Sequence, residues 1–180
     1  MDRRRFVQLV TVGAAASAVM GHSPYRQWHV YRKSRLIIVT SADDQASHAL
    51  GEAIAVVLAR HVAEHPALAS RAAHALDAVK LLASAQLELA ILTAVDARDA
   101  CDGRGRFAGE GALPLRALAV FAPYLLVCRE DFPGSKARLI ANALAQHWRG
   151  GDAVPARTHD VAPSIPLHTG IVLHPSGSHP

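Results

Sequence analysis

Aromatic, cysteine and charged residues are all scarce in this chain of 180 residues. Aromatics account for 5% of it, Asp, Glu, Lys and Arg together for 19%, and hydrophobic residues for 51%. So apolar a composition excludes a disordered chain. Without an N-terminal signal, the length suits one domain with one hydrophobic core. The only cysteines, Cys101 and Cys128, lack C-x-x-C spacing, and the sequence leaves open whether they pair.

A basic groove for nucleic acid is also lacking. The formal net charge is +4, but Arg3, Arg4 and Arg5 stand at the extreme N-terminus. Lysine and arginine gather with aromatic residues only over residues 25–33, which we interpret as a linker rather than a binding arm. We therefore expect no nucleic-acid partner.

The N-terminus carries the pattern of a twin-arginine (Tat) export signal. Two adjacent arginines precede a variable residue, Phe6 and the aliphatic Val7, and an apolar stretch then runs to Met20. This stretch is shorter than the ~20 residues of a membrane span, and small residues over 14–18 offer A-x-A cleavage sites. We predict a signal peptide at 1–20, a linker at 21–34 and a periplasmic location. The alternative is an ordinary basic N-terminus on a buried helix.

Apolar periodicity divides the rest of the chain into alternating strands and helices. Continuous apolar runs predict strands at 36–40, 87–92, 115–121 and 124–128. Helical spacing predicts helices at 45–62, 76–84 and 133–148. Glycines over 102–111 predict a mobile surface loop. The sequence thus predicts an α/β domain over 35–150, with a mostly parallel sheet covered by helices on both faces, and an irregular Pro/His-rich tail over 151–180.

The order of these segments resembles a known family, the TAXI group of solute-binding subunits of TRAP-type transporters. The blocks that carry the resemblance are Leu76–Ile91, Leu115–Ala119, Tyr124–Trp148 and the Pro-Leu-His-Thr-Gly run at 166–170. The resemblance implies a lobe of the periplasmic-binding-protein type II fold, a small carboxylate-like solute and membrane permease subunits as partners.

The chain also departs from this family. Family members hold the ligand between two lobes, and here the second lobe is missing. Their first loop is rich in glycine and tyrosine, whereas residues 40–51 have lost that pattern and carry Asp43 and Asp44, which would repel an anion. Two copies of the chain pairing as a homodimer would offer one replacement for the missing lobe.

Six polar residues follow the first two predicted strands. Because open α/β sheets bind ligands at the carboxyl ends of their strands, we expect these residues to form the ligand site. They are Thr40, Ser41, Gln45, His48, Thr93 and Asp96. The alternative is that these side chains, with Asp43 or Asp44, only cap helices and satisfy loop backbone.

An enzymatic hypothesis rests on His61-Val62-Ala63-Glu64-His65, which matches the H-x-x-E-H pattern of inverted zinc peptidases. Pro66 stops the helix directly afterwards, and no third ligand helix follows. The histidine-rich tail leaves room for weak metal binding only. We therefore expect no enzyme, no catalytic residues, no cofactor and no metal site. The prediction is a reduced TAXI-type solute-binding protein, and the alternative is a lobe that has lost solute binding and acts as a periplasmic protein-interaction module.

Overall fold

The computed structural model describes residues 35–62, 64, 66–149 and 165–171. The predicted signal peptide and linker, and most of the predicted C-terminal tail, lie outside the described residues.

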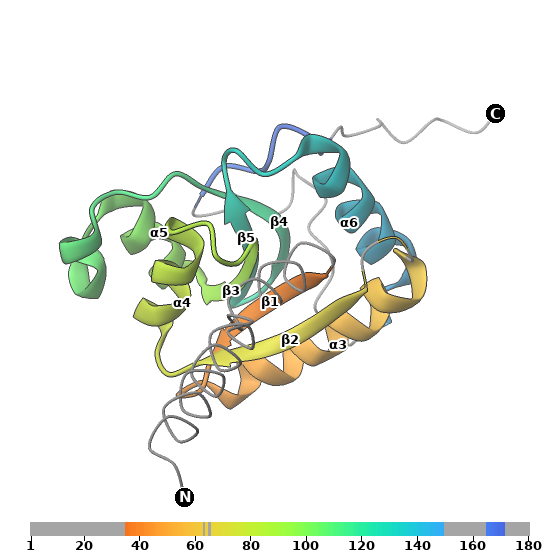
Figure 1. Cartoon of the computed structure of the whole chain (residues 1–180), viewed down its shortest axis with the longest axis horizontal. Coiled ribbons are helices and arrows are strands. Elements are labelled where there is room, and N and C mark those ends of the chain that lie inside the picture. Colours follow the sequence, from red (N-terminus) through yellow and green to blue (C-terminus); the bar gives the residue numbers. More distant parts are fainter. Residues whose placement is uncertain (1–34, 63, 65, 150–164, 172–180) are drawn as a thin grey trace, which may run out of the picture. The chain divides into compact units, whose positions relative to one another are not determined.

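A five-stranded sheet with helices forms the described domain (Figure 1). The elements, labelled as in Figure 1, are β1 Leu36–Ser41, α3 Gln45–His61, β2 Ala67–Ala72, α4 Ala75–Ala83, β3 Leu89–Thr93, α5 Ala94–Asp102, the 3-10 helix η1 Gly105–Glu110, β4 Leu115–Phe121, β5 Tyr124–Arg129 and α6 Gly134–His147. The predicted α/β class is confirmed.

The sheet is mixed, so the predicted mostly parallel sheet is met only in part: β5 runs against the other strands. Its strand order is β2-β1-β3-β5-β4. The β1–β2 and β1–β3 pairs are parallel, whereas β5 runs antiparallel to both β3 and β4. The reason is the connection between β4 and β5, which consists of Ala122 and Pro123 alone. Two residues close a hairpin but cannot make the crossover that a parallel neighbour needs.

Helices cover both faces of the sheet (Figure 1). On one face α4, α5 and η1 pack over apolar side chains of β1, β3, β4 and β5. On the other face α3 and α6 pack over the alternate side chains of the same strands. Cys101 belongs to the first face and Cys128 to the second, and both are free thiols. Burial raises the pKa of Cys128 to about 12, so this thiol is unreactive at neutral pH.

Three elements differ from the sequence expectation. Residues 94–102, for which no helix was predicted, form α5, whose start is capped by the Thr93 hydroxyl. The expected glycine-rich loop contains η1, which is anchored by the fully buried ring of Phe107. The edge strand β2 was not predicted, because its sequence ALASRA has no β-branched residue.

The short segment Ile165–Ile171 packs on the free edge of β4. Backbone hydrogen bonds join the Ala117 amide to the Pro166 carbonyl (2.9 Å) and the His168 amide to the Ala117 carbonyl (3.0 Å). The buried His168 ring donates from Nε2 to the Phe132 carbonyl (2.8 Å) and accepts the Gly170 amide at Nδ1 (3.0 Å). Part of the expected irregular tail thus adds an isolated bridge at this edge of the sheet.

Candidate functional site

A hollow of about 180 Å³ opens at the carboxyl ends of β1 and β3. It is lined by Ser41, Asp43, Asp44, Ser47, Ala75, Ile91, Leu92, Thr93, Asp96 and Arg106. Parallel strands present their carboxyl ends, and the helices that follow them, at the same edge of a sheet. The hollow therefore lies where α3, α4 and α5 all begin. It is smaller than the roughly 300–1,000 Å³ of typical ligand sites, so it suits only a small molecule.

Each of these helix N-termini already holds a carboxylate of the chain itself. Asp44 caps α3 by accepting the Ser47 amide at 3.0 Å, and it also accepts the Tyr124 hydroxyl at 3.0 Å. Asp77 accepts the His74 amide at the start of α4. Asp96 lies in the first turn of α5 and accepts the Thr93 hydroxyl at 2.9 Å. The positive helix ends, which otherwise attract a free anion, are thus compensated from within.

Arg106 is the cation among the residues that line the hollow. Its Nη2 donates to Oδ1 of the buried Asp96 at 2.7 Å, while the Arg106 side chain as a whole stays half exposed. An arginine has five N–H donors, so this pair leaves donors for another anion. With Asp43 and Asp44 close by, the hollow presents one exposed cation beside several carboxylates.

Asp43 pairs with a histidine at the rim of the hollow. Its Oδ2 lies 2.5 Å from Nδ1 of His74. The hydrogen bond and the charge of Asp43 raise the pKa of His74, outweighing desolvation and the opposing charge of Arg106. Because the folded pKa is raised, the pair stabilises the fold fully below the unfolded value of about 6.5, and this contribution is lost as the pH rises through the folded pKa.

We expect Asp43→Asn to destabilise the protein at pH 5.5 and to have a progressively smaller effect towards pH 8. Urea unfolding of wild type and variant at steps of pH gives the difference directly. Asp102→Asn, which removes an exposed carboxylate paired with Arg104 instead of a histidine, is the control. A difference between wild type and Asp43→Asn that stays constant over this range contradicts the assignment.

The structure brings three of the six predicted site residues into the hollow: Ser41, Thr93 and Asp96. Gln45 is exposed at the first turn of α3 and does not line it. Thr40 and His48 are buried, and neither lines the hollow. The expectation that polar residues gather at this edge is thus met by half of the set.

Thr40, His48 and Glu52 form a chain with the order of a nucleophile, a base and an acid. The Thr40 hydroxyl lies 2.9 Å from Nδ1 of His48, whose Nε2 lies 3.3 Å from Glu52. Thr40 is 0% exposed, however, and its hydroxyl also lies 3.2 Å from the Ser70 carbonyl. No substrate reaches such a hydroxyl, so these contacts tie α3 to β1 and β2.

Sequence reasoning missed Arg106 and Tyr124. Arg106 lies in the stretch that we expected to be a mobile loop, ten positions from its partner Asp96. Tyr124 begins β5, and only the antiparallel hairpin places its hydroxyl on Asp44. Desolvation and the hydrogen bond to Asp44 raise the pKa of Tyr124, which therefore stays a neutral donor at physiological pH. No local sequence signal indicates either contact.

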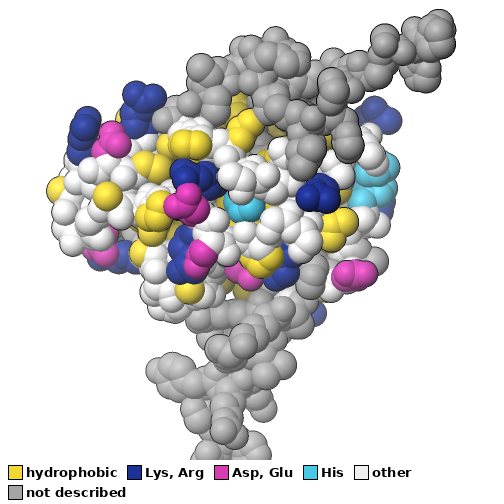
Figure 2. All heavy atoms as spheres, turned by 90° about the horizontal axis from the view of Figure 1, so that it is seen from above, with side chains coloured by type: hydrophobic (Ala, Val, Ile, Leu, Met, Phe, Trp, Pro, Cys, Tyr) yellow, Lys and Arg dark blue, Asp and Glu magenta, His cyan; other side chains and the backbone are white. Residues whose placement is uncertain are grey.

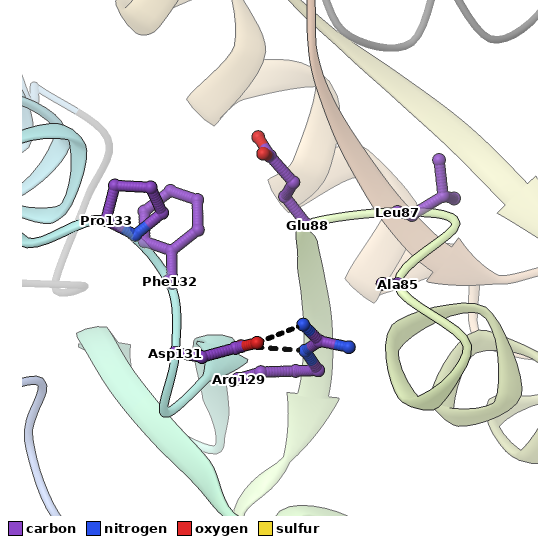
Figure 3. Close-up of a pocket in the computed structure, with 7 residues that line it drawn as sticks. All are labelled: Ala85, Leu87, Glu88, Arg129, Asp131, Phe132 and Pro133. Atoms are coloured by element: carbon purple, nitrogen blue, oxygen red, sulfur yellow. Dashed lines mark hydrogen bonds and ion pairs between the residues drawn. The ribbon is translucent and has the colours of Figure 1, made fainter.

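A second hollow of about 150 Å³ lies where β5 ends and β3 begins (Figure 3). Arg129 and Asp131 point toward each other across two hydrogen bonds, one of them 2.9 Å from Nε to Oδ1. Glu88 pairs with Lys136 at 3.3 Å. The charged groups of this second hollow thus form two neutral pairs, so it offers a ligand fewer unpaired charges than the first hollow does.

On the face drawn in Figure 2, acidic and basic side chains lie intermixed rather than gathered by sign.

Of the H-x-x-E-H stretch, the structure describes His61, Val62 and Glu64. His61, the last residue of α3, stacks on His147, the last residue of α6, with ring centroids 3.6 Å apart. Desolvation and the neighbouring His147 lower the pKa of His61. His65 lies outside the described residues. Among the residues described, no three potential metal ligands cluster, and no helix has the length and apolarity needed to span a membrane.

Comparison with known proteins yields no family assignment. No protein-family model matches the chain, and a search of curated proteins finds no match either.

Proposed function

We propose that the chain is a single-lobe, extracytoplasmic solute-binding protein of reduced TAXI type, and that it binds a small solute in the hollow formed by Ser41, Thr93, Asp96 and Arg106. One observation carries the proposal: a polar hollow lies at the carboxyl ends of β1 and β3, with the half-exposed Arg106 side chain at its rim. A permease in the membrane would receive the solute.

The fold supports this proposal in one further respect. The sheet has a helix layer on each face and polar residues at one edge, as expected of a lobe of the periplasmic-binding-protein type II fold. In a two-lobe protein the chain crosses from one lobe into the second and back. Here Ala122 and Pro123 alone join β4 to β5, so the chain makes no such crossing at this point. The turn lies beside the hollow, where the Ala94 amide donates to the Pro123 carbonyl at 2.9 Å.

The charges favour a zwitterion over a simple dicarboxylate. A solute carboxylate would use the remaining donors of Arg106, whereas a second carboxylate would meet Asp43 and Asp44. An ammonium group placed near these two aspartates would instead be attracted. We therefore narrow the predicted carboxylate-like solute to a small amino acid.

The test is isothermal titration calorimetry of the full chain with a panel of amino acids and dicarboxylates. We expect a 1:1 heat with one small amino acid and a Kd at least about tenfold weaker in Arg106→Gln, since charge-assisted hydrogen bonds contribute roughly 1.5–3 kcal/mol. Arg104→Gln is the matched control, because Arg104 pairs with Asp102 and does not line the hollow. Equal weakening in both variants, or no heat with any compound, contradicts the proposal.

A second candidate function is a protein-interaction module without a solute. It is favoured by the number of polar groups at the hollow that already bond within the chain, among them Asp44, Thr93 and Asp96. The absence of binding heat with every compound of the panel would support this function.

A further inference from the structure

The strand β2 leaves one edge of the sheet open. In the described residues it pairs with β1 only, over Ala67–Ala72, and no strand lies on its other side. The opposite edge is different, since the segment 165–171 covers part of β4. An uncovered edge presents unpaired backbone N–H and C=O groups that can bond to another chain.

The hydrogen bonds to β1 fix which groups of β2 face outward. The carbonyls of Pro66 and Ala72 accept the amides of Leu36 and Ala42 at 3.1 and 2.8 Å, so the even-numbered residues face β1. In a parallel pair, successive residues of a strand direct their backbone groups to opposite sides. Ala67, Ala69 and Arg71 therefore present their N–H and C=O groups at the open edge.

Among the described residues, this edge has few of the features that usually protect one. β2 contains no proline, its register with β1 has no bulge, and Arg71 is its only charged residue. Its other side chains are small apart from Leu68, which packs against the core on the α4 face. An edge strand of ordinary length with so little protection can pair with a further strand.

We propose that a second copy of this chain pairs with β2, antiparallel and about a twofold axis at Ala69. In this register Ala69 lies opposite Ala69 of the partner subunit, and Ala67 lies opposite Arg71 of the partner subunit. All three outward-facing residues then exchange backbone hydrogen bonds with outward-facing residues. A register shifted by one residue would set them against inward-facing groups, and one shifted by two would leave an outward-facing residue of β2 without an outward-facing partner in β2, so this register pairs the most.

Charge complementarity favours a second copy over an unrelated partner. The exposed Glu64 stands before the start of β2, and Arg71 stands near its end. Antiparallel pairing brings the basic end of each strand towards the acidic end of the other, and symmetry makes this contact twice. No arginine faces an arginine, because the two Arg71 side chains are staggered by four residues.

The resulting dimer joins two five-stranded sheets into one continuous sheet. Because the strands of the two copies run in opposite directions, the hollows lie at opposite ends of the joint sheet. This pairing therefore does not close the hollow of either copy. It is independent of solute binding, and each proposal can fail without the other.

The first test is the mass of the full chain by light scattering after size exclusion. We expect twice the chain mass for wild type and a monomer for Ala69→Pro, which removes an outward amide and keeps the bonds to β1. A wild-type monomer at tens of micromolar overturns the proposal. So does an Ala69→Pro variant that folds, by circular dichroism, and stays dimeric.

Oxidative crosslinking tests the register even if Ala69→Pro does not fold. In the proposed dimer the Ala69→Cys thiols are about 5.5 Å apart at Cα and form a disulfide. The Arg71→Cys thiols are staggered by four residues, about 13 Å, which is beyond disulfide reach. We expect a covalent dimer of Ala69→Cys only, above the wild-type background. Crosslinking of Arg71→Cys in preference to Ala69→Cys overturns this register, and crosslinking of neither overturns the pairing.

Discussion

Replacing Gly170 with alanine is expected to release the segment 165–171 from the domain. A Cβ at this position would lie 2.6 Å from both the Cα and the carbonyl oxygen of Gly134, at the start of α6. These are backbone atoms, so no side-chain rotation relieves the overlap. Either α6 or the segment must move, at a cost of about 1–3 kcal/mol. Urea unfolding followed by circular dichroism measures this loss of stability.

Release of the segment would also break the contacts that it makes. Ile165 and His168 are buried, and the His168 ring bridges the Phe132 carbonyl and the Gly170 amide. Limited proteolysis should therefore cut Gly170→Ala near residue 168 faster than wild type. Gly109→Ala is the control, since a Cβ there meets nothing within 4 Å. Equal stability of Gly170→Ala and Gly109→Ala contradicts the prediction.

Gly51→Ala is expected to destabilise the fold although alanine is the better helix former. Gly51 lies inside α3 where the helix approaches β1, and a Cβ would lie 2.8 Å from Cγ2 of Thr40. Alanine gains about 1 kcal/mol of helix propensity over glycine. Overpacking a buried contact costs about 1–3 kcal/mol. Because Thr40 is held by His48 and cannot rotate freely, we expect the cost to exceed the gain, with a net loss of up to about 2 kcal/mol in urea unfolding.

The double variant Gly51→Ala with Thr40→Ser isolates this overlap. Serine lacks Cγ2 but keeps the hydroxyl that contacts His48. We expect the pair to be more stable than the sum of the single changes predicts, by about 1 kcal/mol, which is the coupling typical of residues in contact. Additive effects would mean that Thr40 is not what excludes a side chain at position 51.

The sequence predicts most of this fold because burial leaves a plain pattern. All six residues of β1 are buried, and the first four form the unbroken apolar run that is typical of such a strand. The period of α3 is likewise readable, and its observed end at His61 lies one residue from the prediction. The antiparallel pairing of β4 and β5 follows from the sequence as well, because a two-residue connection between two strands permits only a hairpin.

Other elements depend on tertiary contacts that no local pattern records. The alanines and serine of β2 give no strand signal, and the strand exists because β1 offers it a partner along its whole length. The helix α5 is rich in aspartate but is held by the Thr93 cap and the burial of Ala97 and Ala100. Three of the six polar residues predicted at the strand ends line the hollow. Which of these residues line the hollow depends on the side to which each side chain points from its strand or helix, and Thr40 is buried.

The Ala122–Pro123 turn has a consequence for how binding would be reported. Two-lobe binding proteins change shape when a ligand binds, because one lobe rotates about a hinge towards the other. Here β4 and β5 pair directly with each other through this turn, and β5 is hydrogen-bonded on both sides. If the chain binds a solute as proposed, no rotation between two lobes would accompany binding, so a membrane partner would have to recognise the bound molecule itself or the residues around it.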